Sequence, residues 1–202
     1  MIAEAVRRSP LADYAERFAA LSAGTGGELS IRELPFASQL NLRADPKDGG
    51  VMQRLAGALG FALPVIPNTA VAKDDRPALW LGPDEWLAIG PDSQQAALEQ
   101  ALRSSLSGAF GSIVDVSANR TLLEIRGAKA RELLVQGVSI DLGTRSYGPG
   151  RCAQTLLAKA QVIIERRNES FVLYVRASFA TYVALWLLDA ADDGQLLEAG
   201  VE

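Results

Sequence analysis

A strand pattern that occurs twice along the chain constrains its fold more than any other feature of the sequence. Residues 40–43 (Leu-Asn-Leu-Arg) and 123–126 (Leu-Glu-Ile-Arg) both alternate apolar and polar side chains, as a half-buried strand does, and lie 83 residues apart. Residues 86–92 and 171–178, in which an aromatic residue precedes a helix-capping residue, form a second pair at an offset of about 85. We interpret the two offsets as an internal repeat of a strand, strand, helix, hairpin and helix unit. This predicts an α+β fold with antiparallel sheets and packed helices, and the alternative is a chance agreement between two ordinary α+β segments.

Hydrophobic periodicity divides the chain into an N-terminal helix and two halves. We expect the helix within residues 1–24, the first α+β half over 25–108 and the second over 109–202, or else one compact domain. The expected strands are residues 29–31, 40–42, 78–81, 85–89, 113–116, 121–126, 152–157, 162–166 and 171–176, and the expected helices are residues 11–21, 51–59, 97–106, 128–136 and 179–187.

Capping and turn residues set the boundaries of these elements. Ser9 followed by Pro10 is typical of a helix start. Asp92 or Ser93 is expected to cap one later helix, and Ser178 the last one. Residues 61–77 contain three prolines, which predict an irregular connection.

The chain contains no histidine among its 202 residues. Histidine is the side chain most often used for proton transfer near neutral pH, and it is the commonest metal ligand. A Ser-His or Cys-His pair is therefore excluded, and a zinc site would need carboxylates around one thiol at a spacing that the sequence does not show. No G-x-G-x-x-G follows an expected strand, so a nucleotide or flavin has no recognisable cradle. We expect no catalytic, cofactor-binding or metal-binding residue in this chain.

Three further candidates for chemistry have simpler structural explanations. Cys152 follows Arg151, which could activate its thiolate, but a lone cysteine that opens an apolar strand is usually a buried small hydrophobe. Residues 148–151 (Gly-Pro-Gly-Arg) lack the lysine and hydroxyl of a phosphate loop and predict a turn. Asp84 and Glu85 could act as an acid and a base, but neighbours in a Gly-Pro turn are expected to point into water.

Charge and hydropathy limit the partners of the chain. Twenty basic and twenty-four acidic residues give a net charge of −4, so no basic surface for nucleic acid or an anionic membrane is expected. The N-terminus lacks the apolar segment of a secretory signal, and no apolar run is long enough for a transmembrane helix. These features, together with a single cysteine, predict a cytoplasmic protein.

Tryptophan and arginine residues remain as candidates for partner recognition, because both types are enriched in buried interface patches. For the tryptophans, which are Trp80, Trp86 and Trp186, core packing is the simpler interpretation. For the arginines, a solvated face is the simpler one, and the candidates are Arg120, Arg126, Arg145, Arg151 and Arg176. The glycine-containing loop over residues 142–151 is the best single candidate for partner contact, with Arg145, Tyr147 and Arg151 as its contact residues.

Several spaced segments of the chain resemble the gamma subunit of heterotetrameric sarcosine oxidase. The hairpin at residues 80–87 (Trp-Leu-Gly-Pro-Asp-Glu-Trp-Leu) carries the most specific part of the resemblance. One departure is Gly143-Thr144, where the family pattern leads us to expect a histidine and a proline. The other segments, spread over about residues 10–191, are Leu34-Pro35-Phe36 before 39–43, Leu63-Pro64 before 67–69, Asp115-Val116-Ser117 before Arg120, Asp141-Leu142, residues 150–157, and Arg176 before 178–180.

The resemblance implies a non-catalytic subunit in a cytoplasmic complex with alpha, beta and delta subunits. That complex oxidises sarcosine to glycine with O2, giving H2O2 and 5,10-methylenetetrahydrofolate. FAD, FMN, NAD, tetrahydrofolate and zinc are implied to lie in the other subunits, with this chain as a scaffold. The family fold is similar to that of the folate-binding aminomethyltransferases, and residues 150–155 resemble the K-G-C-Y-x-G-Q-E motif of those enzymes only in their glycine and cysteine.

Two other functions stay open at this point. The first is a freestanding folate-binding aminomethyltransferase relative, in which Asp115, Asp141 or Glu165 would carry the acid-base chemistry. The second is an adaptor for an unrelated oxidase. The sequence does not decide which surface meets a partner, or whether the secondary amine is sarcosine or a close analogue.

Overall fold

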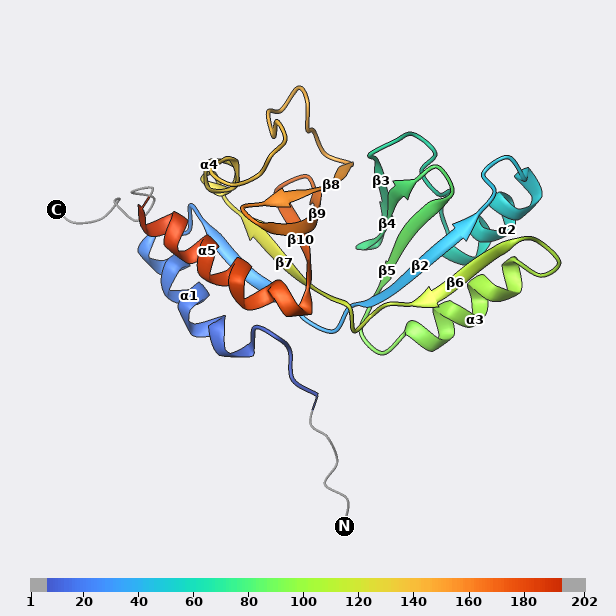
Figure 1. The fold of residues 1–202 in the computed structure, drawn as a ribbon, viewed down its shortest axis with the longest axis horizontal. Helices are drawn as coiled ribbons and strands as arrows, with labels where there is room; N and C mark the ends of the chain where they lie inside the picture. Colours follow the sequence, from blue (N-terminus) through green and yellow to red (C-terminus); the bar gives the residue numbers. More distant parts are fainter. Residues whose placement is uncertain (1–6, 194–202) are drawn as a thin grey trace, which may run out of the picture.

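The computed structural model describes residues 7–193. Within that range the chain forms two five-stranded antiparallel sheets (Figure 1). Sheet A has the strand order β1 (Ser30–Leu34), β7 (Arg120–Arg126), β10 (Ser170–Arg176), β9 (Ala160–Arg166) and β8 (Arg151–Leu157). Sheet B has the order β6 (Gly111–Asp115), β2 (Ser38–Ala44), β5 (Glu85–Gly90), β4 (Arg76–Gly82) and β3 (Ala70–Lys73).

The internal repeat is confirmed, with the first strand of each repeat exchanged. Each half runs strand, strand, helix, three strands and helix. The first strand of the first half, β1, pairs with β7 in sheet A, whereas the first strand of the second half, β6, pairs with β2 in sheet B. Figure 1 shows the chain passing through a short turn from sheet A into β2 of sheet B and returning from β6 into β7. Leu40 lies opposite Ala88 and Leu123 opposite Leu173, so the offsets of 83 and 85 residues describe equivalent cross-strand pairs.

The two sheets and their helices make four layers. The outer face of sheet A packs against α1 (Ala15–Gly24), α4 (Ala130–Val135) and α5 (Ala180–Asp193). The outer face of sheet B packs against α2 (Gly49–Leu59) and α3 (Gln95–Ser105). A third apolar cluster lies between the sheets, and its buried members are Leu79, Leu87, Ile89, Leu122, Cys152, Ile163, Val172 and Tyr174.

The central strands are apolar on both faces because both faces are covered. In β7, Leu122 faces the layer between the sheets and Leu123 faces the helices, and both are buried. Residues 171–175 of β10 are buried without interruption. Strand β2, by contrast, has the half-exposed Asn41 between buried leucines, as its alternating sequence predicts.

Several predicted boundaries are wrong, and in two cases the expected cap binds a distant partner instead. Ser9 does not cap the first helix, because its hydroxyl donates to Glu33 and a 3₁₀ turn (Ala12–Tyr14) precedes α1. Neither Asp92 nor Ser93 caps α3: the helix has Gln94 as its N-cap residue, with no side-chain hydrogen bond. Asp92 forms an ion pair with Arg7 instead.

Two further corrections concern the end and the middle of the chain. Ser178 lies inside a 3₁₀ turn (Ala177–Phe179) that precedes α5. The segment 61–77 is not wholly irregular, because it contains β3 and the start of β4. Strand β3 is held partly by a residue far along the chain, since Ala70 N donates to Gly150 O at 2.8 Å.

The start of β8 also contacts the segment before β3, which makes a second contact between the halves besides the exchanged strands. Cys152 lies at this contact. Its N–H donates to Asn68 O at 3.0 Å, and its thiol donates to Thr69 O at 3.2 Å. The side chain is fully buried, which confirms that it packs as a small hydrophobe. Burial raises the pKa of the Cys152 thiol to about 12, because an apolar environment disfavours the thiolate.

Because each sheet takes one strand from the other half, we propose that the halves 25–108 and 109–202, with the N-terminal helix, unfold as one unit rather than as separate domains. Backbone hydrogen bonds join β1 to β7 and β6 to β2, and each of these pairings connects one half to the other. Thermal unfolding should therefore show one transition by circular dichroism and by tryptophan fluorescence. Two separated midpoints would contradict this proposal.

Gly127→Ala is expected to destabilise the whole chain by about 2 to 4 kcal/mol. Gly127 has φ of +106°, and an added Cβ would lie 2.1 Å from Glu28 O, in the backbone just before β1. The clash separates β1 from β7, and a cooperative chain would lose stability as a whole. The free energy of unfolding in urea measures the effect.

Gly57→Ala is the matched control for Gly127→Ala. Gly57 lies inside α2, and beyond the backbone of its own helix an added Cβ meets no atom of the described residues within 4 Å. Alanine in a helix interior is expected to stabilise by about 0.5 to 1 kcal/mol relative to glycine. Equal effects of the two substitutions would show that the approach of Gly127 to Glu28 does not matter.

Cys152→Ala is expected to reduce the loss of stability at high pH. The pKa of the thiol is about 12 in the folded chain and near 8.5 in the unfolded chain. The stability that the neutral thiol contributes is therefore fully present below about pH 8.5 and is lost as the pH rises towards 12. In this window the wild type should lose up to about 1.4 kcal/mol per pH unit more than the variant. Urea unfolding of both chains at about pH 7.5 and about pH 10 tests this; parallel pH dependences would contradict it.

Candidate functional site

The three residues predicted to contact a partner, in the loop over 142–151, differ in exposure. Arg145 is exposed in a turn. Tyr147 is only 5% exposed, and its hydroxyl donates to Ile164 O at 2.8 Å, so it packs within this chain. Burial raises the pKa of Tyr147 well above its usual range. Arg151 is half-buried as the first residue of β8, and its Nε has no hydrogen-bond partner among the described residues.

The loop begins with a turn that Asp141 organises. Asp141 accepts hydrogen bonds from Gly143 N at 2.7 Å and from the Ser146 hydroxyl, and these contacts lower the pKa of its carboxyl. An added Cβ at Gly143 would lie 2.9 Å from Asp141 Oδ1. That oxygen is the end of a flexible side chain, so the departure at Gly143-Thr144 belongs to the turn that Asp141 organises. The turn predicted within residues 148–151 is confirmed, and it lies at residues 149 and 150.

The three carboxylates considered for acid-base chemistry are each held by different neighbours. Glu165 is buried and accepts from Tyr174 Oη at 2.7 Å and from Arg167 Nε at 3.1 Å. Burial raises the pKa of Tyr174, and the charge of Glu165 adds to the effect. Asp115 accepts from the hydroxyl and N–H of Ser117. No hydrogen bond joins Glu165, Asp115 or Asp141 to another of the three within the described residues.

The predicted turn carboxylates also have internal partners. Asp84 has a side chain that is 49% exposed, and it pairs with Arg43 at 2.9 Å. Glu85 is only half-exposed and accepts from Asn41 Nδ2 at 2.7 Å. The expectation that both point into water therefore holds for Asp84 alone.

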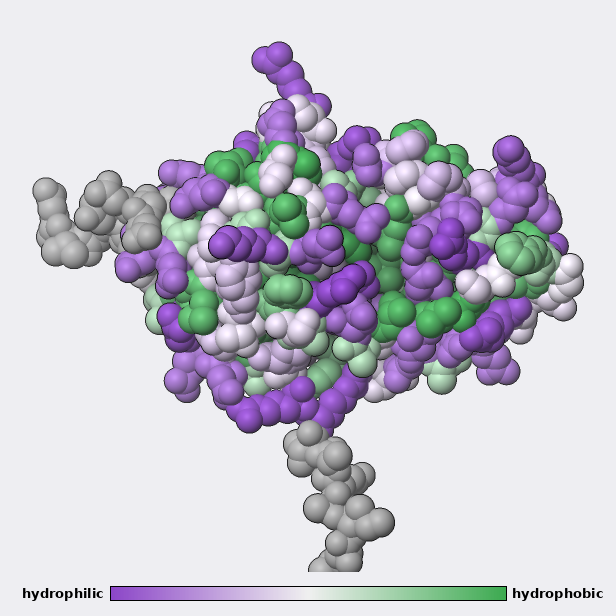
Figure 2. Space-filling view, in the orientation of Figure 1, coloured by the Kyte–Doolittle hydropathy of each residue, from purple (hydrophilic) through white to green (hydrophobic). Residues whose placement is uncertain are grey.

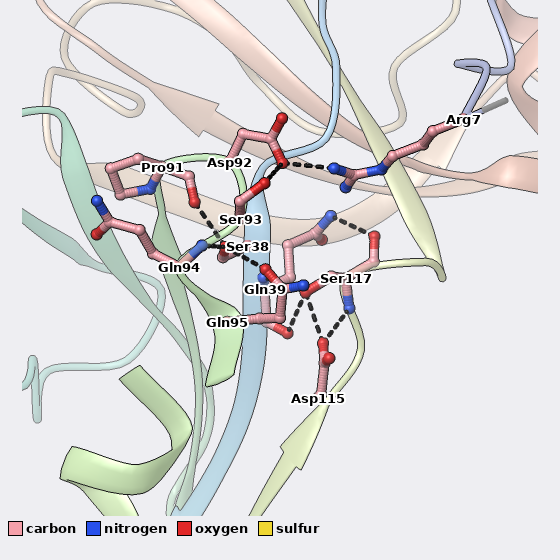
Figure 3. Close-up of polar contacts among 10 residues, drawn as sticks. All are labelled: Arg7, Ser38, Gln39, Pro91, Asp92, Ser93, Gln94, Gln95, Asp115 and Ser117. Carbon is pink, nitrogen blue, oxygen red and sulfur yellow. Dashed lines mark hydrogen bonds and ion pairs between the residues drawn. The ribbon is translucent and has the colours of Figure 1, made fainter. Parts of the chain in front are cut away.

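Polar side chains gather where the exchanged strands cross (Figure 3). Ser38, at the start of β2, donates to Pro91 O at 2.6 Å and accepts from Gln94 N at 3.1 Å. Gln39 Nε2 donates to Arg120 O at 2.7 Å, and Gln39 N donates to Ser117 Oγ at 2.9 Å. Both Ser38 and Gln39 are buried, and these bonds satisfy the groups that the crossing removes from water, except Gln39 Oε1, which has no partner among the described residues. The contacts give this cluster a structural role.

Two cavities differ sharply in charge. The larger, of about 780 Å³, is lined by four arginines and five carboxylates. Ion pairs already join these charges, including Arg32 with Glu124 at 2.7 Å and Arg126 with Glu169 at 3.5 Å. The smaller, of about 480 Å³, is lined by Arg120 and Arg176 and, among the described residues, by no carboxylate.

Exposed apolar residues mark surfaces that the sequence did not single out. Figure 2 shows hydrophobic patches separated by hydrophilic residues on one face of the molecule. Phe110 is 97% exposed in the turn between α3 and β6, and Val114 is exposed on the edge strand β6. Val65 and Ile66 are exposed between two prolines. Their hydrophobicity could have raised them as candidates, but buried and exposed apolar residues look alike in a sequence.

The buried tryptophan of the hairpin packs as predicted. Trp86 is fully buried, and its indole N–H donates to Pro64 O at 2.6 Å. Trp80 and Trp186 are partly buried at the edges of two apolar clusters.

The described residues lack two kinds of feature, a metal cluster and a membrane-spanning helix. Over residues 7–193, no group of three or more Cys, Asp or Glu side chains is placed to hold a metal ion. Within the same range, none of the helices has both the length and the apolar character needed to cross a bilayer.

Curated relatives match the chain over nearly its whole length. The sarcosine oxidase subunit gamma of Corynebacterium sp. (strain P-1) is 38% identical over 190 residues, which are 93% of this chain and 91% of that relative. The sarcosine oxidase subunit gamma of an Arthrobacter species is 38% identical over 187 residues, covering 92% and 90% of the two chains.

Solved structures match the fold. A chain of the heterotetrameric sarcosine oxidase from Corynebacterium sp. U-96 superposes with a TM-score of 0.84 at 34% identity, covering 97% of this chain and 99% of that one. The glycine cleavage system aminomethyltransferase T from Bartonella henselae superposes with a TM-score of 0.66 at 15% identity, covering 98% of this chain and 64% of that enzyme. The second likeness shows the fold alone, and it confirms the predicted aminomethyltransferase-like architecture.

The family model described as sarcosine oxidase, gamma subunit family, matches residues 43–193. This range includes the hairpin at 80–87 and the cross-strand pair of the second half, Leu123 with Leu173. The relatives extend the match to the N-terminal helix. The chain belongs to the sarcosine oxidase gamma subunit family.

Proposed function

We propose that this chain is the gamma subunit of a cytoplasmic heterotetrameric sarcosine oxidase and has no catalytic residue of its own. The observation that supports this most is the superposition, over 97% of the chain, on a chain of a heterotetrameric sarcosine oxidase. In this proposal the partners are the alpha, beta and delta subunits. The complex converts sarcosine and O2 to glycine, H2O2 and 5,10-methylenetetrahydrofolate, and the other subunits hold FAD, FMN, NAD, tetrahydrofolate and zinc.

Internal bonding of the polar groups supports a non-catalytic role. A general acid or base must be free to reach a proton on the substrate. Glu165, the most buried carboxylate of the rival proposal, is engaged by Tyr174 and Arg167. Cys152 is buried with a raised pKa and is therefore a poor nucleophile.

Exposed apolar residues on a chain that works in a complex favour burial against a partner. Phe110 exposes nearly its whole ring, and it lies beside the unpaired edge of β6. Aromatic anchors dominate protein interfaces when a partner covers them. We infer two candidate contact surfaces: the turn at Phe110, and the loop that carries Arg145 with the nearby Arg151.

A freestanding folate-binding aminomethyltransferase relative is the second candidate. The similarity to aminomethyltransferase T favours it only at the level of fold. Titration of the purified chain with tetrahydrofolate would distinguish the two, because saturable micromolar binding would favour this candidate.

Co-expression of the other three subunits with and without this chain tests the proposed function. Without it, we expect the yield of assembled, flavin-loaded complex to fall at least about tenfold, because a subunit that contributes contact surface stabilises the assembly by mass action. Native mass measurement and sarcosine-dependent O2 consumption give the two readouts. Full assembly and full activity without the chain would refute a scaffold role.

Alanine variants of the two candidate surfaces locate the contact. Phe110→Ala or Arg145→Ala should weaken binding to the other subunits by about tenfold or more if the residue is an interface anchor. Lys159→Ala, an exposed cation in the turn between β8 and β9, is the control. Wild-type affinity in both test variants would contradict both surfaces, while the unfolding temperature shows that each variant folds.

A further inference from the structure

Arg120 and Arg176 lie directly opposite each other on neighbouring strands. Arg120 begins β7 and Arg176 ends β10, and the two are cross-strand partners in the register of sheet A. Like charges at opposite positions of an antiparallel pair destabilise the sheet. Both positions share the face of Leu122 and Tyr174, which is the face turned towards sheet B.

Neither guanidinium has a counterion in the described part of the chain. No hydrogen bond or ion pair joins the side chain of Arg120 or Arg176 to another residue in 7–193, whereas the arginines of the larger cavity are paired. Burial lowers the pKa of Arg120, and the neighbouring charge of Arg176 lowers it further. The structure therefore keeps two cations together, one of them half-buried, with no ion pair to either within the described residues.

The nearest carboxylates are already engaged elsewhere. Glu85 acts on Arg120 through its charge, but it accepts from Asn41 Nδ2 at 2.7 Å and lies 3.8 Å from Arg43 Nη1. Asp115 borders a neighbouring cavity that Arg120 also lines, and its oxygens accept from Ser117. Because Glu85 and Asp115 are engaged in this way, the two arginines keep the capacity to bind an external anion.

The cavity in front of the two arginines has the chemistry of an organic-anion site. Its volume of about 480 Å³ lies in the usual range for small-ligand pockets, about 300 to 1,000 Å³. Its polar lining outside the two arginines consists of neutral hydroxyls and amides, from Ser139, Thr155, Gln154 and Gln161. The rest of the wall is aliphatic, from Ile140, Leu156, Val162 and Ile163.

We propose that Arg120 and Arg176 form a binding site for the carboxylate of an organic acid, with the aliphatic wall of the cavity holding its apolar body. Guanidinium groups bind carboxylates through paired N–H donors, and two of them can share one carboxylate. The carboxylate can come from a free small molecule or from an acidic side chain of a neighbouring subunit. The site itself does not depend on the proposed function, and only the second source rests on it.

Benzoate is the probe for this site, and benzamide, its uncharged analogue of the same shape, is the control ligand. Titration of the purified chain by calorimetry or by amide chemical shifts should give saturable benzoate binding with a Kd on the order of 1 mM. Benzamide should bind at least about fivefold more weakly, and added salt should weaken benzoate only.

Arg120→Gln and Arg176→Gln should each weaken benzoate at least about fivefold, and Arg120→Lys should lie between them and the wild type. Arg17→Gln, an exposed arginine of α1, should leave binding unchanged. Either glutamine variant should also raise the unfolding temperature of the chain by about 1 to 3 °C, because it removes the repulsion across β7 and β10. This shift shows that the variant folds.

Assembly with the other subunits distinguishes the two sources of the carboxylate. Benzoate binding that both arginines control, with unchanged assembly of the variants, supports a free organic acid. Absent benzoate binding with assembly weakened at least about tenfold in both glutamine variants, and partly restored by Arg120→Lys, supports a partner's acidic side chain. Equal binding of benzoate and benzamide would overturn the proposal, and so would variants that change neither benzoate binding nor assembly. Both outcomes are independent of the co-expression experiment that leaves this chain out.

Discussion

Backbone pairing between exchanged strands holds the two halves of this chain in one molecule. Strand β1 supplies an edge of sheet A, and β6 supplies an edge of sheet B, although each belongs to the opposite half. The exchange forces the chain to cross between the sheets twice. Buried polar groups at the crossing must find partners there, and Ser38, Gln39 and Ser117 provide most of them. The crossing is therefore as much a part of the core as the apolar clusters are.

The layer between the sheets is apolar in its middle and charged at its margins. Leu87, Leu122 and Tyr174 pack in the middle, so the sheets meet through buried side chains. At one margin arginines and carboxylates neutralise each other, whereas at the other Arg120 and Arg176 stand together. The charges of the first margin are therefore paired within the described residues, whereas the two arginines of the second have no ion pair there.

Periodicity gave a good account of the elements and a poor account of their ends. The alternation at 40–43 and 123–126 fixes which side chains share a face, and equivalent faces produce equivalent registers. The helix caps predicted at Ser9 and Asp92 are wrong because these residues bind Glu33 and Arg7, which lie far away in sequence. Strand β3 was missed because part of its pairing comes from Gly150, which no local pattern reveals.

The sequence by itself determined the repeat, the α+β class, the burial of Cys152 and Trp86, and the membership of a family through spaced motifs. The tertiary structure decided that β1 and β6 change sheets, that Tyr147 turns inward while Arg145 stays exposed, and that Arg120 and Arg176 face each other. The physical reason is the range of the forces involved. Side-chain alternation and local propensity act within a few residues, whereas strand partners and charge neighbours are chosen by contacts between segments about 50 to 100 residues apart.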